Sequence, residues 1–530
     1  MITGSVQSSH ERCGDNMIYL VILLVLVLLY KYTTKNHDYW EKRNVKYEKP
    51  VPIFGTDYKN VVGQKSLTEM SAELYNKYPN EPVVGLLRGT TPELVVRDLD
   101  VVRRILNVDF AYFYPRGLGR NPEVEPVFYN LFHVDGDLWK LLRQRLTPTF
   151  TTAKLKNMFP LVVKCAEKLQ HVGEDVVSRG GECDVRDLMA RFAMEFIGAC
   201  GFGIQTDTIN NDHSLFKELG NKIFRPYFRK YLMIACYDLF PDLRILLQKI
   251  LHENDLIDAV TVIFKNIREQ RNYKPIGRND FIDLLLELEG KGKITGESVE
   301  KRDANGTPEQ VEMEMNFTCM AAQVFLFFAA GFETSSSSTS FMLHQLAYHP
   351  EEQRKIQKEI DRVLNKYDNK LCYDSISEMT ALSNGFKEAM RLFPSVGTLH
   401  RVCARRCTIP ELNLTLDPGV KIIVPVQAIQ NDEKYFDNPS QYLPDRFNDP
   451  NVGRHKYAYM PFGEGPRACI GARLGEMQSL AGLAAVLHKF SVEPGPRTLR
   501  YPEVNHGSNV IQSIKGGLPL KLTLRNKSNR

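Results

Sequence analysis

The chain has 530 residues, of which 43% are hydrophobic and 25% are charged. These fractions exclude a disordered or fibrous protein and indicate a folded body. The net charge of +5 comes from 68 basic and 63 acidic residues that are interspersed without long single-sign blocks, so we expect a mixed, solvated surface and no nucleic-acid partner.

Ten cysteines are scattered along the sequence, with Cys403 and Cys407 as the closest pair. Small secreted proteins that depend on disulfides carry cysteines far more densely. The gap between these two residues fits no common zinc site, and no second Cys/His pair follows at zinc spacing. We therefore expect isolated thiols in a reducing compartment.

The first distinctive segment is an uncharged apolar run, Met17–Tyr30. It is shorter than the ~20 residues that a membrane-spanning helix usually needs, and it would also suit the core of a signal peptide. However, no small-residue cleavage site follows it, and the flanking Lys31 and Tyr32 lengthen the usable span by reaching the membrane interface. Basic residues accumulate after the run, so the positive-inside rule predicts a lumenal tail and a cytosolic body.

A polar stretch after this run ends in two alternating prolines, Pro50 and Pro52, which disfavour helix and stiffen the chain. We expect the folded body to begin there. The predicted organisation is a lumenal tail over residues 1–16, a transmembrane anchor over 17–32, a polar, proline-containing extended linker over 33–52 and a single large domain over 53–530.

Apolar spacing after the linker predicts a mainly α fold with small β-sheets at its edges. The helical pattern covers most of residues 135–345, and the apolar run Met320–Phe332 suits the buried centre of a long helix. That run is too short for a second membrane span and contains Gln323. Further signals predict helices over 65–77 and after 469, strands near 83–84, 94–96 and 420–424, and a C-terminal hairpin that pairs 510–514 with 518–522.

The clearest chemistry lies in Pro461–Gly471 (PFGEGPRACIG), which we call the cysteine loop. A cysteine that binds haem iron must be a thiolate, must approach a flat macrocycle closely and should be shielded from water. Glycines in the loop allow tight turns, Arg467 supplies positive charge and Phe462 can shield the sulfur of Cys469. A helix that begins just after the cysteine would add its N-terminal dipole.

The pattern Phe-Gly-x-Gly-x-Arg-x-Cys-x-Gly in this loop resembles the haem-binding loop of the cytochrome P-450 family, with every fixed position present. The resemblance implies a single P-450-type haem domain and haem b as the cofactor, with Cys469 as the axial thiolate ligand of the iron. It extends over nearly the whole chain. It is strongest to the insect microsomal branch that includes xenobiotic-metabolising families, although Gln430 stands where that branch often has histidine.

Three further motifs occur in the order that the family requires. In Ala330–Thr334 (AGFET), Gly331 would leave room beside the iron, the Thr334 hydroxyl can bond to the carbonyl of residue 330, and an acid next to an alcohol can pass protons. A Glu-Thr pair in a helix is by itself usually capping or surface chemistry. The resemblance makes Glu333 and Thr334 the expected catalytic pair.

The second motif is the pair Glu388 and Arg391, which in isolation would be a surface ion pair. In the family this pair is completed by an arginine of a later loop, and Pro444–Phe447 (PDRF) resembles that loop. We therefore expect Arg446 to be the third member of a structural group that fixes the chain leading to the cysteine.

The third motif places Trp139 and Arg143 one helical turn apart. Haem carries two propionates, for which an indole N–H and a guanidinium are suitable donors. By resemblance, Arg401 and Arg467 should also reach the propionates. Each arginine taken alone would more often be a solvated surface charge.

The implied function is a monooxygenase that inserts one atom of dioxygen into an apolar small molecule. Electrons would come from NADPH through NADPH–cytochrome P-450 reductase, with a b-type cytochrome as a further candidate partner, at the endoplasmic reticulum membrane with the catalytic domain on the cytosolic side. Substrate-facing positions are expected in residues 113–133, 325–329, 396–399 and 508–511. Two alternatives stay open, namely a haem-thiolate isomerase or dehydratase that does not use dioxygen, and a non-catalytic haem or ligand binder.

Overall fold

A long apolar segment forms the central helix of the body, α13 (Phe317–Tyr348). Asn316 caps the start of this helix by accepting a hydrogen bond of 2.9 Å from the Cys319 N–H. Most of the α13 side chains are buried on every face, as is typical of a helix inside a large core. The predicted buried helix over Met320–Phe332 is confirmed, and α13 extends beyond it at both ends.

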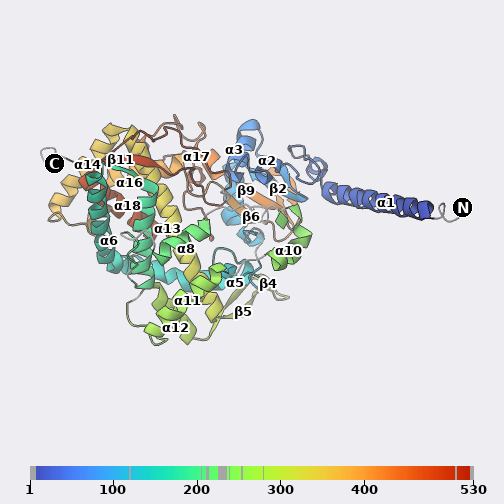
Figure 1. Ribbon diagram of the computed structural model, residues 1–530, viewed down its shortest axis with the longest axis horizontal. Coiled ribbons are helices and arrows are strands. Elements are labelled where there is room, and N and C mark those ends of the chain that lie inside the picture. Colours follow the sequence, from blue (N-terminus) through green and yellow to red (C-terminus); the bar gives the residue numbers. More distant parts are fainter. Residues whose placement is uncertain are drawn as a thin grey trace.

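The computed structural model describes residues 7–118, 121–204, 206–209, 214–224, 236–237, 239–251, 255–278, 280–507 and 510–525. Helices gather around α13 on one side of the body, the largest sheet lies on the other side, and α1 projects beyond that sheet (Figure 1). The predicted fold class, a mainly α body with small sheets, is confirmed.

The body helices follow the apolar spacing of the sequence, and α7, α16 and α18 pack directly against α13. In chain order the helices are α1 (Gln7–Thr34), α2 (Tyr58–Val61), α3 (Leu67–Lys77), α4 (Leu99–Arg103), α5 (Gly136–Leu146), α6 (Thr152–Ser178), α7 (Val185–Phe196), α8 (Leu215–Phe224), α10 (Arg244–Leu251), α11 (Asp255–Gln270), α12 (Phe281–Gly290), α13, α14 (Pro350–Lys366), α15 (Tyr373–Ser377), α16 (Thr380–Leu392), α17 (Val426–Gln430) and α18 (Ala472–Lys489).

The largest sheet among the described residues has the strand order β1-β2-β9-β6, built from β1 (Val83–Arg88), β2 (Thr91–Val96), β6 (Leu399–Val402) and β9 (Lys421–Val424). Strands β2 and β9 are parallel, and the other two pairs are antiparallel. Smaller sheets join β10 (Phe490–Glu493), β11 (Pro519–Leu524) and β3 (Glu182–Asp184), then β4 (Lys293–Arg302) with β5 (Pro308–Glu314), and β7 (Cys407–Ile409) with β8 (Leu414–Leu416).

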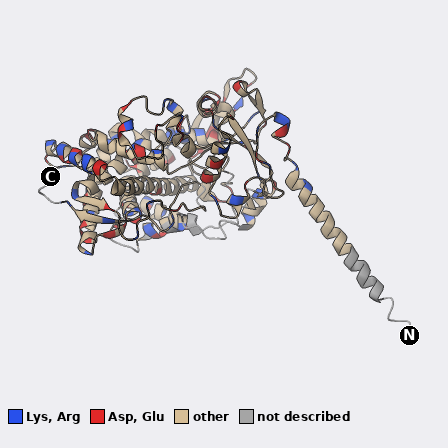
Figure 2. Cartoon of the chain, turned by 90° about the horizontal axis from the view of Figure 1, so that it is seen from above, with Lys and Arg blue, Asp and Glu red and all other residues tan. Residues whose placement is uncertain are grey.

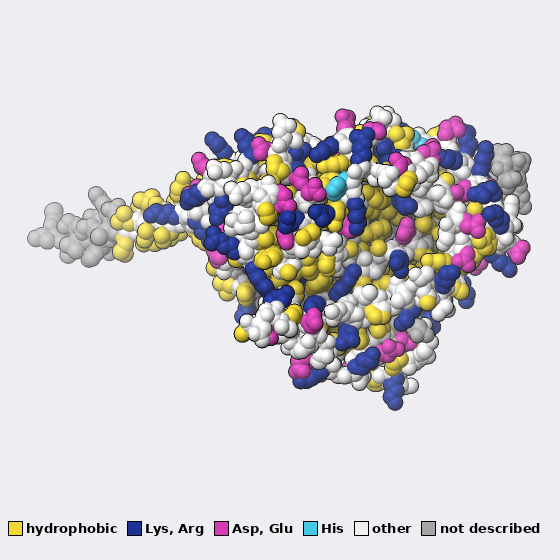
Figure 3. All heavy atoms as spheres, turned by 180° about the vertical axis from the view of Figure 1, so that it is seen from behind, with side chains coloured by type: hydrophobic (Ala, Val, Ile, Leu, Met, Phe, Trp, Pro, Cys, Tyr) yellow, Lys and Arg dark blue, Asp and Glu magenta, His cyan; other side chains and the backbone are white. Residues whose placement is uncertain are grey.

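The N-terminal apolar run lies in α1, which has 28 residues and is longer than the predicted anchor. At ~1.5 Å per residue this helix exceeds the ~30 Å hydrocarbon core of a bilayer. Within the described residues, two helical segments are long and apolar enough to cross a membrane, and the one within α13 is mostly buried. The other, Met17–Thr34, is exposed over most of its length and carries no charge between Met17 and Tyr30 (Figures 2 and 3).

The segment expected to be an extended linker is instead folded against the largest sheet. Trp40 is completely buried, and its indole N–H donates to the Leu86 carbonyl at 2.9 Å. A side chain at Gly85 would collide with the Trp40 ring, so this glycine makes room for the indole. The burial of one large aromatic side chain therefore draws residues 33–52 onto the body, which the proline pattern did not reveal.

Two predictions about strands were wrong or incomplete. The C-terminal strand β11 pairs with β10 and β3, which are distant in sequence, and not with residues 510–514. The hairpin β4–β5 interrupts the region that was predicted to be helical, and its first strand packs along α5. Asp137 of α5 holds this hairpin by accepting hydrogen bonds from the Ser298 hydroxyl and the Val299 N–H.

Candidate active site

The cysteine loop forms a tight turn that ends at α18, so the predicted helix after Cys469 is confirmed. Gly463 and Gly465 adopt φ values of +71° and +79°, a conformation that favours glycine. A side chain at Gly465 would lie 2.0 Å from the Leu106 carbonyl oxygen, so the loop can approach this backbone only with glycine there. The Cys469 N–H closes the turn by donating to the Phe462 carbonyl at 2.8 Å.

Two arginines bind the backbone that precedes Cys469. Arg143 donates from Nη1 to the carbonyl of Ala468 at 2.8 Å, and Arg116 donates from Nη2 to the carbonyl two residues before the cysteine at 2.9 Å. Burial raises the pKa of the Cys469 thiol, while the backbone N–H two residues later and these two guanidinium groups act to lower it. The positive groups around Cys469 thus partly offset the effect of burial, and the pKa of the free thiol stays above its ordinary value.

Arg401 and Arg467 complete a cluster of cations with Arg116 and Arg143. Withdrawal from water, together with repulsion from neighbouring arginines, lowers the pKa of Arg401 and of Arg467 to about 9. Asp135 accepts a hydrogen bond of 2.6 Å from Arg467. Even so, Nε of Arg401 and both Nε and Nη1 of Arg467 are buried without a hydrogen-bond partner among the described residues.

This cluster fits a ligand that carries several negative charges. Buried charges that lack a partner strongly destabilise a folded protein, and arginine donors match carboxylate oxygens well. The two propionates of haem would supply such oxygens beside a cysteine that is suited to bind iron. The donor set of the chain therefore fits haem.

Trp139 and Arg143 lie on one face of α5, and both reach the cysteine loop. The Arg467 guanidinium stacks 4.4 Å above the centre of the Trp139 ring. Phe462 is partly buried and packs against the main hydrophobic core. The structure thus gathers the predicted haem-contacting residues around one loop, with Arg401 joining them from β6.

The predicted catalytic pair lies in the middle of α13. The Thr334 hydroxyl donates to the Ala330 carbonyl at 2.8 Å, the contact that the sequence predicted. The side chains of Ala330 and Thr334 are accessible, although this part of the helix is otherwise largely buried. Glu333 is buried and forms an ion pair with Arg186 of α7, a partner that the sequence analysis missed.

Ser395 holds the backbone next to this pair through two hydrogen bonds. Ser395 donates to the Thr334 carbonyl at 3.1 Å and also bonds to the Ser338 hydroxyl at 2.9 Å. Gly331 was expected to leave room beside the iron. Instead, a side chain at Gly331 would meet Ile197 at 2.5 Å, so the glycine admits the close packing of that isoleucine.

Glu388, Arg391 and Arg446 come together as predicted. Arg391 donates to both Glu388 oxygens, from Nε at 2.8 Å and from Nη2 at 2.9 Å. Arg446 donates from Nε to Glu388 at 3.0 Å. Glu388 and Arg391 have no exposed surface, so this is a buried ionic group and not a surface pair.

Gln430 links this ionic group to the cysteine loop. The Arg391 guanidinium donates to the Gln430 carbonyl at 2.8 Å, and the Gln430 side chain accepts from the Met460 N–H at 3.0 Å, one residue before the loop begins. In the sequence alone, Gln430 stands out only as a departure from the family pattern. Its role, like those of Arg116, Asp135 and Arg186, depends on contacts between distant segments and left no local signal.

One predicted substrate-facing segment lies directly on α13. The Gln323 side chain accepts from the Leu131 N–H at 3.0 Å and donates to the Tyr129 carbonyl at 2.9 Å. These bonds hold part of the 113–133 loop against the central helix. Within the predicted segment 508–511, residues 508 and 509 lie outside the described residues.

Known proteins agree with this arrangement. The sequence pattern described as "Cytochrome P450" matches residues 45–517. The chain is 36% identical to cytochrome P450 6B6 of Helicoverpa armigera over 507 residues, covering 95% of this chain and 98% of that protein. It is 34% identical to cytochrome P450 6a2 of Drosophila melanogaster, covering 96% and 99%. Members of this family bind haem through a cysteine thiolate. The chain belongs to the cytochrome P450 family of haem-thiolate monooxygenases and resembles its insect members.

Proposed function

We propose that this protein is a membrane-anchored monooxygenase that inserts one atom of dioxygen into an apolar small molecule, with Cys469 as the ligand of the haem iron. The observation that carries this proposal is the cluster of buried guanidinium groups around the cysteine loop, with donors that lack a partner. Haem, when bound, supplies the iron at which dioxygen is activated, and electron donation by a thiolate ligand favours cleavage of the O–O bond.

The residues around the cysteine bind and orient the cofactor. Arg143, Arg401 and Arg467 would neutralise the propionates, and Trp139 would add its indole N–H. Phe462, on the same loop, would shield the sulfur from water once haem is bound. Because Arg143 also holds the Ala468 carbonyl, it would fix the cofactor and the backbone of its ligand together.

Glu333 and Thr334 deliver protons. The Thr334 hydroxyl lies on the accessible side of α13. While it donates to the Ala330 carbonyl, its oxygen can accept a hydrogen bond, and turning away from that carbonyl would free its proton for transfer. Glu333 is the acid next to it and is held by Arg186, a positioning residue in this proposal. Rotation of the Glu333 carboxylate away from Arg186 would connect Thr334 to a proton source.

Glu388, Arg391 and Arg446 have a structural role. Arg391 reaches the carbonyl of Gln430, which in turn binds the chain just before the cysteine loop. We infer that these contacts set the position of Cys469, so loss of one charge should reduce haem incorporation and not merely the turnover rate.

The remaining assignments concern the cellular setting. We propose a lumenal tail over 1–16, an anchor over 17–32 and a catalytic body on the cytosolic side of the endoplasmic reticulum membrane, because basic residues follow the apolar run. Residues 33–52 would connect the anchor to the body while packed on the sheet. Electrons would come from NADPH through a flavoprotein reductase, with a b-type cytochrome as a further candidate donor.

The experiment uses the purified full-length protein with NADPH, a flavoprotein reductase, isotopically labelled dioxygen and a panel of apolar compounds. The proposal predicts products that contain one labelled oxygen atom, formed only when the reductase is present. Rearranged or dehydrated products formed without dioxygen would indicate the isomerase alternative. Haem binding without any product across the panel would indicate the non-catalytic alternative.

A further inference from the structure

A buried serine, Ser395, joins the loop after α16 to the middle of α13. Its hydroxyl donates to the Thr334 carbonyl at 3.1 Å, and the Ser338 hydroxyl oxygen lies 2.9 Å from the Ser395 hydroxyl oxygen. A hydroxyl has one proton to donate, and that of Ser395 goes to the carbonyl, so Ser338 is the donor in the second bond. Ser395 therefore holds the helical turn from Thr334 to Ser338 from outside the helix.

The other side of this loop is held by Gln512 of the C-terminal segment. The Gln512 backbone N–H donates to the Ser395 carbonyl at 2.8 Å, and the Gln512 side-chain amide donates to the Pro394 carbonyl at 2.7 Å. Two consecutive carbonyls of the loop are thus fixed by one residue. Ser338, Ser395 and Gln512 together connect the C-terminal segment to the backbone of Thr334, and we call these three residues the serine–glutamine link.

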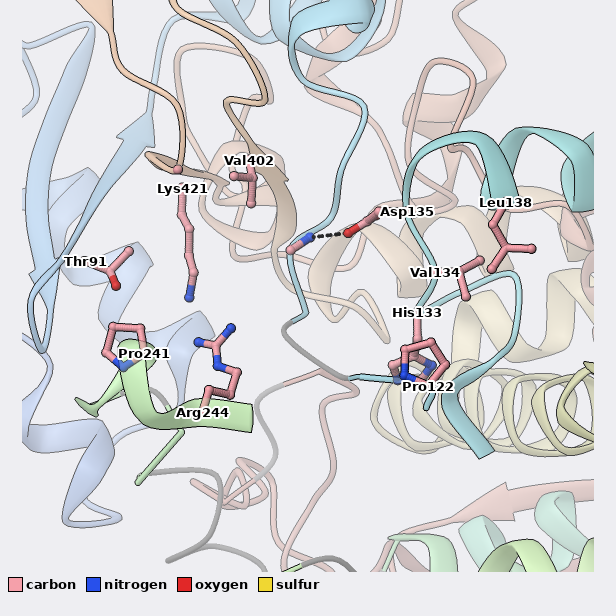
Figure 4. A pocket seen from close by; sticks show the side chains of 12 residues that line it. Thr91, Pro122, His133, Val134, Asp135, Leu138, Pro241, Arg244, Val402 and Lys421 are labelled. Atoms are coloured by element: carbon pink, nitrogen blue, oxygen red, sulfur yellow. Dashed lines mark hydrogen bonds between the residues drawn. The ribbon is translucent and has the colours of Figure 1, made fainter. Parts of the chain in front are cut away.

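The serine–glutamine link is shielded from water. Ser338, Ser395 and Gln512 are buried, and none of them lines the cavity of about 500 Å³ between the largest sheet and α10 (Figure 4). A buried hydrogen bond has little competition from water, and a buried group that loses its partner costs free energy. The link is therefore a firm constraint on the backbone that carries the Thr334 hydroxyl.

Both ends of the loop contacts adjoin segments that were predicted to face the substrate. Residues 396–399 follow Ser395 directly, and Gln512 follows the predicted segment 508–511. Val396 and Ile511 keep some accessible surface, whereas Ser395 and Gln512 beside them are buried. The link thus connects the surroundings of the predicted substrate-facing segments to the residue that is proposed to deliver protons.

We propose that Ser395 is a positioning residue for proton delivery, and that Gln512 holds Ser395 in place for this role. Thr334 transfers the proton, and Ser395 acts on it only through the Thr334 carbonyl. This inference rests on the proposed function, because proton delivery by Thr334 is part of that proposal.

The first test measures the ratio of NADPH oxidised to product formed. It uses the full-length, haem-loaded protein with a flavoprotein reductase, and 7-ethoxycoumarin is the first probe of the apolar panel. Ser395→Ala should raise this ratio about fivefold, the effect of losing one neutral hydrogen bond. Ser395→Thr keeps the hydroxyl and should restore the ratio of the unmodified protein. The matched control is Ser340→Ala, which removes an equally buried hydroxyl that bonds to carbonyls of α13 itself and should leave the ratio unchanged.

A double variant separates positioning from a general weakening of the fold. If Ser395 acts through Thr334, adding Ser395→Ala to Thr334→Ala should not change the ratio further, because the hydroxyl to be positioned is already absent. Gln512→Met removes the side-chain amide and should raise the ratio in the unmodified background but not in Ser395→Ala. A further fivefold rise in the double variant of Ser395 and Thr334 would overturn the proposal.

Hydrogen exchange provides a measurement that needs no turnover. Within α13 the Ser338 N–H donates to the Thr334 carbonyl, the same oxygen that Ser395 holds. Exchange of the amides in residues 334–338 should therefore be about fivefold faster in Ser395→Ala than in the unmodified protein or in Ser395→Thr. Equal exchange in all three would overturn the proposal. An unchanged ratio in Thr334→Ala would mean that the proposed function fails, whereas a raised ratio there with an unchanged ratio in Ser395→Ala would overturn this inference alone.

Discussion

At the scale of single residues, the arginines around the cysteine loop are the most informative feature. Arg401 and Arg467 are buried, and their guanidinium groups keep nitrogen atoms without hydrogen-bond partners among the described residues. Folded proteins rarely leave such donors unsatisfied, so these side chains are arranged for an anionic ligand. The sequence could predict Arg467 because it lies in a fixed pattern around Cys469. It could not predict Arg116 or Asp135, because their importance comes from contacts with a loop more than 300 residues away.

Removal of the Thr334 hydroxyl tests its proposed role in proton delivery. In Thr334→Ala the hydroxyl is lost while the helix is retained, so reducing equivalents should be released as hydrogen peroxide and not as product. We expect the ratio of NADPH oxidised to product formed to rise by about tenfold or more, since proton transfer by a positioned group contributes about 10²–10⁴-fold. Thr334→Ser keeps the hydroxyl and should stay close to the unmodified protein. An unchanged ratio in Thr334→Ala would contradict this role.

At the scale of elements, the buried ionic group joins α16 to the chain that leads into the cysteine loop. Removing one partner from a buried ion pair costs about 3–5 kcal/mol, because the other charge stays buried without compensation. Glu388→Ala should therefore lower the free energy of unfolding by about that amount and reduce the ratio of haem to protein. Urea unfolding and haem quantification provide the measurements.

A matched control is Glu378→Ala, which removes an exposed carboxylate just before α16. Exposed ion pairs contribute about 0–1 kcal/mol, so this variant should keep its haem and its stability. Similar losses in both variants would show that the ionic group has no special role in positioning the cysteine.

His400 of β6 should make the free energy of unfolding depend on pH. Withdrawal from water lowers the pKa of His400 to about 4, whereas the unfolded chain has the ordinary value of about 6.5. Below pH about 6.5 the unfolded state binds a proton that the folded state does not, so stability falls as the pH drops toward about 4. The free energy of unfolding should decrease between about pH 7 and about pH 5, and His400→Gln should flatten this slope. The same slope in the variant would contradict the assignment.

The sequence predicted the elements that have strong local patterns. The apolar run Met320–Phe332 became α13, and the segments near 65–77, 83–84, 94–96 and 420–424 became α3, β1, β2 and β9. The C-terminal strand was assigned the wrong partner, because pairing with β3 and β10 depends on the tertiary fold and not on a nearby turn. The hairpin β4–β5 was missed because its strands are polar and exposed, with little apolar alternation to reveal them.

At the scale of the whole molecule, α1 is a helix that projects from the body (Figure 1). Shortly after its C-terminal end, the buried Trp40 side chain fixes the chain to the sheet. Deleting residues 1–31 should therefore move the protein from the membrane pellet toward the soluble fraction without preventing folding. Membrane fractionation measures the first effect, and the haem spectrum measures the second. A truncated protein that stays entirely in the pellet would contradict the role of α1 as the anchor.

Replacement of Trp40 should lower the stability of the fold without releasing the protein from the membrane. Trp40→Ala removes a fully buried indole and should cost about 3–5 kcal/mol of stability, while the full-length variant stays in the membrane fraction. Urea unfolding of the detergent-solubilised protein measures the loss. A change below about 1 kcal/mol would mean that residues 33–52 behave as the extended linker that the sequence predicted.

Every functional role proposed for this protein depends on Cys469 as the thiolate ligand of haem. The most direct measurement is the absorption spectrum of the reduced protein with carbon monoxide. The unmodified protein should show the strongly red-shifted Soret band of thiolate-ligated haem. The band should be lost in Cys469→Ser and retained in Thr334→Ala. Absence of the band in well-folded, haem-loaded protein, or its persistence in Cys469→Ser, would contradict the central claim.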